Sequence, residues 1–459
     1  MRIALCQALC PTERLAKALQ AVPTGVLPPV ITGLATHASE VQKGDIFVAL
    51  QGKKKHGACY AAEAFSRGAV GVLASQSDVL PNGSAALLCA DPLVALQHAA
   101  ATRRAACQCL IAVSGSAGKT TVKEAIAAVL SRDRSVSYSK GNFNSTLGLP
   151  LSLLSFEKSD CFVVELGISH PGEMEPMARL CAPELALLTN VGSAHVGHFR
   201  DGAHLKKEKA QIAAFLAPNG RFLIPSGLQL QDPPCSTKRI FRFGQGGDCY
   251  LEVVSNGKNG VVGDLIAADR VITNLSWPIG GEIGVSVLEA VGSVGVLMGV
   301  SDDDVRRGLV QAALQAPRMQ SLFVKGGEWI DDAYNASPEA VKRALDVLKV
   351  WGRGKPTVAV LGDMLELGDS AVQHHTNLGA YVAKSDIDML LTYGSLALHI
   401  AKGALAAGMP KEQIQSFEQE EREALKGALL SLPPGATVII KASGGMQLSR
   451  LAREVANKL

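Results

Sequence analysis

A short segment near residue 118 carries the residue types that bind phosphate. It consists of Gly115, Ser116, Ala117, Gly118, Lys119, Thr120 and Thr121. Glycines let the backbone turn tightly with its N–H groups directed at an anion, and a helix N-terminus adds partial positive charge. Lys119 can reach the outer phosphates of a nucleotide, and Thr120 can offer its hydroxyl to Mg²⁺. The segment therefore predicts a nucleotide-binding loop, although Val113 stands where the strict motif has its first glycine.

The flanking sequence supplies the elements that such a loop needs. Apolar residues 109–113 precede it as a predicted strand, and an Ala-rich helical pattern follows over 122–130. A simple glycine–serine turn would explain the glycines but not Lys-Thr-Thr at the start of a helix. The order strand, loop, helix favours the phosphate loop.

Two polar residues follow neighbouring apolar strands. Glu165 lies at the end of a predicted strand, within 161–167, where a lone carboxylate is costly unless it meets a cation. In a phosphate-loop fold this strand end faces the nucleotide, so we expect Glu165 to ligate Mg²⁺. His195 follows the next predicted strand, 185–191, at a parallel position. It is either a metal ligand or an ordinary loop residue.

A later helical segment carries Lys206, Lys207 and Lys209 around a glutamate. Several lysines on one helix usually form a solvated face. Their spacing alone does not assign a separate role to any one of them.

The whole chain has the composition of an α/β protein. Its 459 residues are 47% apolar and 19% charged, with β-then-α alternation along most of the length. We expect a mostly parallel α/β architecture with units at 1–105, 106–316 and 317–459. A net charge of +3 indicates no nucleic-acid partner.

The apolar stretches and the cysteines indicate the cellular compartment of the protein. The longest late apolar stretch is too short to span a bilayer. Ten cysteines without a C-x-x-C pair predict buried free thiols in a reducing cytosol. We therefore expect a cytoplasmic, monomeric protein without membrane insertion.

Several stretches taken together resemble the Mur ligase family of peptidoglycan synthesis. The stretches are 115–123, 141–144 with 148–150, 165–167 with 171–173, 331–336 with Pro338, and 362–368 with His375. The resemblance implies a UDP-substrate-binding N-terminal domain, an ATP-binding central P-loop domain and a Rossmann-like C-terminal domain. The Asp-Asp-x-Tyr-Asn-Ala and Gly-Asp-Met-x-Glu-Leu-Gly motifs resemble the branch that joins D-alanyl-D-alanine to UDP-N-acetylmuramoyl-tripeptide. The implied reaction uses ATP and Mg²⁺ and passes through an acyl phosphate.

The resemblance also implies roles for individual residues. Lys119 would neutralise phosphate charge, Thr120 and Glu165 would hold Mg²⁺, and His195 would hold a second ion. Lys209 matches a lysine that family members carbamylate. Residues implied to contact the nucleotide or the substrates are Arg318 and Asp332 for the nucleotide, and Asn142, Asn144 and Asn335 for the substrates.

The chain departs from the family pattern at several recognition positions. The usual Asp-Ser-Arg or Asp-Thr-Arg reads His-Ala-Ser at 37–39, the usual Asp-Gly-His reads His-Gly-Ala at 56–58, and the usual His-Asn-x-x-Asn falls at 282–286 without those residues. Gly444 stands where the late Lys-Gly-Ser-Arg motif has its arginine. Two alternatives therefore stay open. One is another Mur-type ligase, tripeptide-forming or folylpolyglutamate-like. The other is a weakly catalytic nucleotide-binding paralogue that acts as a partner of cell-wall enzymes.

Overall fold

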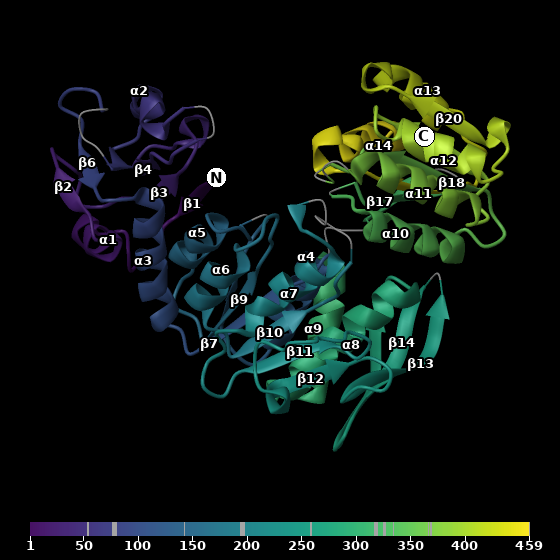
Figure 1. Cartoon of the computed structure of the whole chain (residues 1–459), viewed down its shortest axis with the longest axis horizontal. Helices are drawn as coiled ribbons and strands as arrows, with labels where there is room; N and C mark the ends of the chain where they lie inside the picture. Colours follow the sequence, from purple (N-terminus) through teal and green to yellow (C-terminus); the bar gives the residue numbers. More distant parts are fainter. Residues whose placement is uncertain are drawn as a thin grey trace.

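The computed structural model describes residues 1–52, 55–75, 80–141, 143–192, 198–257, 259–315, 320–324, 327–333, 335–365, 367 and 370–458. Within these residues the strands form three separate sheets, of six, nine and six strands. Figure 1 shows the sheets as three units, with the second lying between the first and the third. The predicted α/β class is confirmed.

The first unit contains a six-stranded sheet and three helices among its described residues. Its elements are β1 (Arg2–Ala4), α1 (Thr12–Leu19), β2 (Val22–Thr24), β3 (Gly33–Ala35), β4 (Asp45–Val48), α2 (Ala61–Ser66), β5 (Gly71–Ala74), β6 (Ala86–Leu88) and α3 (Pro92–Ala105). Strands β3 to β6 are parallel, and the edge strands β1 and β2 pair antiparallel. Helix α3 leads to the second unit and packs on α5 and α6 there.

The second unit is built on the nine-stranded sheet. Its elements are β7 (Cys109–Ser114), α4 (Lys119–Leu130), β8 (Val136–Tyr138), α5 (Gly148–Ser155), β9 (Cys161–Glu165), α6 (Met174–Cys181), β10 (Leu185–Leu188), α7 (Gly202–Ala210), β11 (Arg221–Pro225), β12 (Ile240–Phe243), β13 (Cys249–Gly257), β14 (Gly260–Ala267), β15 (Arg270–Trp277), α8 (Gly281–Leu297) and α9 (Asp302–Gln315). The strands from β8 to β13 pair in parallel, and β14 and β15 continue the sheet as an antiparallel meander. Helices α4, α8 and α9 pack together on one apolar core, whereas α5 and α6 contribute to another.

The third unit is again a helix-covered sheet. Its elements are β16 (Gln320–Val324), β17 (Gly327–Asp331), α10 (Pro338–Trp351), β18 (Thr357–Gly362), α11 (Ala371–Ala383), β19 (Met389–Tyr393), α12 (Leu398–Ala406), β20 (Ile414–Phe417), α13 (Arg422–Leu430), β21 (Thr437–Lys441) and α14 (Leu448–Ala456). The order is β16-β17-β21-β18-β19-β20, and only the edge strand β16 pairs antiparallel among the described strands. Helix α10 contacts α8, which joins this unit to the second.

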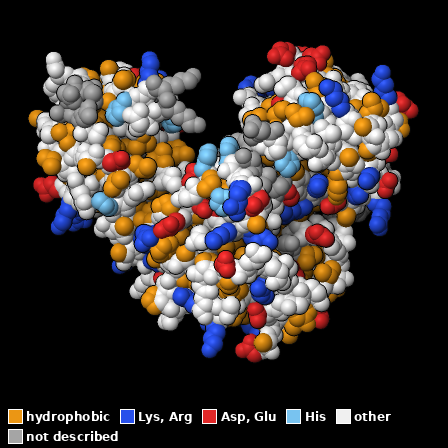
Figure 2. Space-filling model, viewed as in Figure 1, with side chains coloured by type: hydrophobic (Ala, Val, Ile, Leu, Met, Phe, Trp, Pro, Cys, Tyr) orange, Lys and Arg blue, Asp and Glu red, His pale blue; other side chains and the backbone are white. Residues whose placement is uncertain are grey.

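The surface, the helices and the cysteines can be compared with the predictions about membrane insertion and free thiols. Figure 2 shows the first and third units as separate lobes above the second. Among the described residues, no helix is both long and apolar enough to cross a membrane. The ten cysteines are free, as predicted, but burial is not uniform because Cys59 is exposed in a turn before α2.

Candidate active site

The phosphate loop lies between the end of β7 and the start of α4. Gly115 has φ +149°, and a Cβ there would lie 2.0 Å from Thr189 Oγ1, so only glycine fits. Gly118 has φ +78°, the left-handed conformation that glycine adopts without strain. Asn190, two residues after the end of β10, braces the loop, because its side-chain amide accepts from Ala117 N–H at 3.0 Å and donates to Ala117 O at 2.8 Å. The loop is therefore held in shape by the protein itself.

Two lysines from different elements converge on one carbonyl of this loop. Lys119 Nζ donates to Gly115 O at 3.0 Å, and Lys209 Nζ lies 3.3 Å from the same oxygen. Lys209, on α7, is only 1% exposed, whereas Lys206 is half-buried and Lys207 is exposed. Burial, followed by the nearby Lys119 charge, lowers the pKa of Lys209 to about 7. The usual solvated face of such a helix therefore does not include Lys209, the lysine that the resemblance distinguishes from its neighbours.

Glu165 lies beside the loop at the end of β9. Thr120 Oγ1 donates to Glu165 Oε2 at 2.7 Å, and Asn144 Nδ2 donates to Glu165 Oε1 at 2.8 Å. The carboxylate is 3% exposed, and no Lys or Arg of the described residues forms an ion pair with it. A buried carboxylate in these surroundings needs a cation. Oxygen donors from Thr120 and Glu165 suit Mg²⁺, so these residues fit the implied metal.

No larger ligand cluster accompanies these two residues. In the part of the chain that the structure describes, no group of three or more His, Cys, Asp or Glu side chains could hold a metal ion. His195, the residue implied to hold a second ion, lies outside the described residues.

A buried lysine supports Glu165 from behind, and sequence reasoning assigned it no role. Lys123 on α4 is fully buried and donates to Ser139 O, while Ser139 Oγ accepts from the backbone N–H of Glu165 at 3.1 Å. Lys123 thereby connects α4 to Ser139, which in turn holds the backbone of Glu165. A single lysine within the apolar pattern of this helix was the available signal.

The third unit presents a second set of polar groups. Lys441, at the end of β21, forms an ion pair with Asp332 and donates to Asn335 O at 3.0 Å. The neighbouring Asp331 instead accepts from Ser449 Oγ at 2.6 Å. The two consecutive aspartates therefore have different surroundings, and only Asp332 lines the cavity described below.

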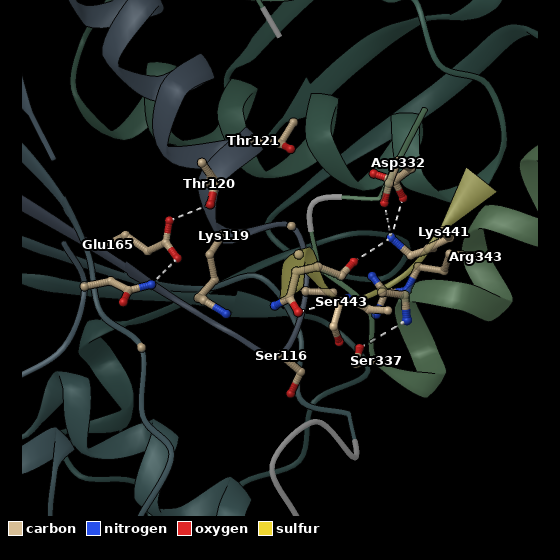
Figure 3. A pocket seen from close by; sticks show the side chains of 18 of the residues that line it. Ser116, Lys119, Thr120, Thr121, Glu165, Asp332, Ser337, Arg343, Lys441 and Ser443 are labelled. Atoms are coloured by element: carbon tan, nitrogen blue, oxygen red, sulfur yellow. Dashed lines mark hydrogen bonds and ion pairs between the residues drawn. The ribbon is translucent and has the colours of Figure 1, made fainter. Parts of the chain in front are cut away.

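Both sets of groups face one cavity of about 630 Å³. The residues predicted for the site that line it are Ser116, Ala117, Gly118, Lys119, Thr120, Thr121, Asn144, Glu165, Asp332 and Asn335. In Figure 3, Lys119, Thr120 and Glu165 lie on one side, and Asp332, Lys441 and Arg343 lie on the other. Gly115 and Lys209 contact each other next to the loop without lining the cavity. Asn142 and Arg318, like His195, fall outside the described residues.

A buried histidine shapes the loop after β18, at one wall of this cavity. His375 on α11 accepts from Met364 N–H at Nε2, 3.0 Å away, and its Nδ1 lies 2.7 Å from Ala371 O. Burial lowers the pKa of His375, so the ring is neutral and Nδ1 carries the proton. This bond holds the backbone just before Leu365, which lines the cavity.

Comparison with known proteins identifies the family. Residues 113–286 match the Mur ligase middle domain, and residues 317–444 match the Mur ligase, glutamate ligase domain. The chain belongs to the Mur ligase family.

Full-length relatives are similar to this Mur ligase. The UDP-N-acetylmuramoyl-tripeptide–D-alanyl-D-alanine ligase of Bacillus subtilis (strain 168) is 31% identical over 432 residues, which are 93% of each chain. The crystal structure of MurF from Acinetobacter baumannii is 26% identical, covers 99% of both chains and superposes with a TM-score of 0.84. The MurF ligase from Thermotoga maritima in complex with ADP shares the fold, at 24% identity, a TM-score of 0.75 and coverage of 92% and 97%. The predicted Mur ligase architecture is confirmed.

The residues at which this Mur ligase departs from the family pattern can be located in the structure. Glu282 and Ser286 line a second cavity of about 370 Å³, next to Thr189 and Asn190 behind the phosphate loop. Gly444 lines the first cavity, where the family pattern has an arginine. In the first unit, Asp45, which follows the departure at 37–39 and is not itself one, is fully buried and paired with Arg2, with Nε–Oδ2 at 2.7 Å. Asp45 therefore stabilises the first sheet and is not available to a substrate.

Proposed function

We propose that this protein is an ATP-dependent ligase that joins D-alanyl-D-alanine to UDP-N-acetylmuramoyl-tripeptide in peptidoglycan precursor synthesis. Its relatives carry this activity in their names over the full length of the chain. The observation that carries the proposal is the shared cavity. A phosphate loop from the second unit and an Asp–Lys pair from the third unit line the same space. Such a space can bring the phosphates of a nucleotide next to the reacting groups of two further substrates.

The reaction requires activation of a carboxylate. The terminal carboxylate of the tripeptide attacks the γ-phosphorus of ATP, and ADP leaves, which yields an acyl phosphate. The amine of D-alanyl-D-alanine then attacks the acyl carbon, and phosphate leaves from the tetrahedral intermediate as the amide forms. Lys119 and the loop N–H groups stabilise phosphate charge, and positioning in a closed site brings the two anions together. Asn144 and Asn335 are proposed to contact the substrates.

The proposed metal is Mg²⁺, held by Thr120 and Glu165, with His195 at a second ion. When bound, Mg²⁺ would neutralise charge on the phosphates. We further propose that Lys209 carries a carbamate, since its amine is buried beside the phosphate loop and its pKa, lowered to about 7, leaves a large share of it unprotonated at neutral pH.

The proposed nucleotide site extends over both cavities. The base would enter the second cavity at Glu282 and Ser286, and Arg318 and Asp332 would reach the nucleotide from the third unit. The three sheets support domain boundaries at 1–105, 106–316 and 317–459. We place the reaction in the cytoplasm and propose that the protein acts as a monomer.

The function is tested by release of inorganic phosphate from ATP. We expect release only when UDP-N-acetylmuramoyl-tripeptide and D-alanyl-D-alanine are both present. Release with the UDP-dipeptide and a third amino acid, or with a folate and glutamate, would assign a different ligase reaction. ADP binding without substrate-dependent release under any pairing would identify a non-catalytic paralogue instead.

Replacing Glu165 by glutamine should raise the Mg²⁺ concentration needed for half-maximal phosphate release by about tenfold or more, since one metal-binding charge is lost. The amide keeps the side-chain shape, so binding of ADP without Mg²⁺ should change little. A Mg²⁺ titration of phosphate release measures the effect. Glu175→Gln, at an exposed site on α6, is the matched control. An unchanged Mg²⁺ requirement in Glu165→Gln would remove Glu165 from the proposed metal site.

A further inference from the structure

Arg343 is a cavity-lining cation that neither the family motifs nor the proposed mechanism assigns. It lies on α10, where Ala340 and Arg343 are three residues apart on one face and both line the first cavity. The opposite side of α10 is apolar and buried, with Val341 and Leu345 in the core. The packing of α10 therefore directs Arg343 toward the active-site cavity (Figure 3).

Arg343 occupies the junction of the two cavities. It lines the 630 Å³ cavity of the phosphate loop and also the 370 Å³ cavity beside Thr189 and Asn190. Among the described residues, it is the one lining residue that the two cavities share. A ligand that extends from the phosphate loop into the second cavity must therefore pass this side chain.

The guanidinium group is half-buried without a protein acceptor. In the described part of the chain, Arg343 donates no hydrogen bond and forms no ion pair within 4.0 Å. Glu339 and Glu282 act on it only through longer-range charge interactions, and burial lowers the pKa of Arg343. A guanidinium has five N–H donors, and desolvating them without acceptors costs free energy. The group is therefore arranged to meet an anionic ligand.

We propose that Arg343 binds the nucleotide at this junction by donating to the phosphate nearest the nucleoside. This inference rests on the proposed nucleotide site. Phosphate oxygens accept two parallel hydrogen bonds from a guanidinium, which a base or a single carbonyl does not match as well. A contact with the dipeptide or the UDP-substrate would not require Arg343 to reach the second cavity. The residue thus supplies a cation to the nucleotide side of an active site that lacks the usual arginine at 444.

The test is a set of binding measurements without the acceptor substrates. Displacement of a fluorescently labelled ADP by ADP, AMP and adenosine is measured for the wild type and for Arg343→Gln. We expect Arg343→Gln to weaken ADP and AMP by about tenfold or more, because a charge-assisted hydrogen bond is lost. Adenosine, which has no phosphate, should bind equally to both proteins. Arg343→Lys should fall between them, since lysine keeps the charge but not the paired donors.

Lys342→Gln is the matched control on the same helix. Lys342 contacts the Tyr381 ring at 5.3 Å and lines neither cavity. Unchanged ADP affinity in Arg343→Gln, or an equal loss for adenosine, overturns the inference and leaves the proposed function intact. A wild type that binds no ADP overturns both. Thermal unfolding of each variant verifies that the comparison is made between folded proteins.

Discussion

Replacing Lys119 by alanine is expected to lower kcat/KM for substrate-dependent phosphate release by about 10³-fold. Lys119 Nζ lies at the mouth of the phosphate loop, 3.0 Å from Gly115 O, and lines the cavity. From there its ammonium group can stabilise the negative charge that develops as the γ-phosphoryl group is transferred. Alanine removes this charge in a site where water cannot replace it at low cost. The measurement is steady-state phosphate release as a function of ATP concentration, with both acceptor substrates at saturating concentrations.

Two further variants make the Lys119 result specific. Lys207→Ala removes an exposed lysine from α7 and should leave phosphate release within about twofold of the wild type. Lys119→Met keeps the aliphatic length without the charge, and it should be as inactive as Lys119→Ala. If either Lys119 variant retained more than roughly a tenth of wild-type kcat/KM, charge stabilisation by this lysine would be ruled out as a main contribution.

Replacing Lys209 by methionine is expected to lower phosphate release strongly while stabilising the fold. The wild-type amine is almost fully buried, with Gly115 O at 3.3 Å and the Lys119 charge nearby. Exchanging a buried charge for an apolar side chain of similar length should raise the free energy of unfolding at neutral pH by about 1–4 kcal/mol. Activity should fall at least about 100-fold, because methionine cannot carry a carbamate next to the phosphate loop. Urea unfolding and phosphate release measure the two effects.

The pH dependence of this effect has a definite sign. The folded-state pKa of Lys209, about 7, lies below the ordinary lysine value of 10.5, so the unfolded chain binds more protons between these values. Stability of the wild type relative to Lys209→Met should therefore rise as pH increases from about 7 to about 10. Phosphate release should fall as pH decreases through about 7, because carbamylation requires the neutral amine.

The carbamate itself can be observed directly. Protein equilibrated with ¹³C-labelled bicarbonate should give a carbamate carbon resonance in the wild type and in Lys206→Met, but not in Lys209→Met. A wild-type spectrum without this resonance, recorded above pH 7, would rule out carbamylation. Equal stability of wild type and Lys209→Met across the pH range would instead contradict the prediction that burial of the Lys209 ammonium group destabilises the fold.

The phosphate loop and the placement of Glu165 beside it could be predicted from sequence because the signals are local. Two glycines, Lys119 and Thr120 lie within one turn between a strand and a helix, and Glu165 closes an apolar strand. Their geometry follows from backbone conformations that neighbouring residues impose. The α/β alternation is equally local, since each strand and helix shows its own periodicity.

The surroundings of the lysines, aspartates and arginine depend on tertiary packing. The spacing of the lysines on α7 is the same whichever face packs inward, and only the fold buries Lys209 against the phosphate loop. Asp331 and Asp332 are adjacent aspartates, yet Asp331 accepts a hydrogen bond from α14 and Asp332 pairs with Lys441.

The sequence by itself therefore determined the phosphate loop, the position of Glu165 at a strand end and the α/β class, because these depend on short-range backbone geometry. Only the tertiary structure decided that Lys209 is buried beside the loop and that Arg343 stands between the two cavities. Burial and charge environment arise from segments far apart in the chain, and a pattern along the chain does not report which of them meet.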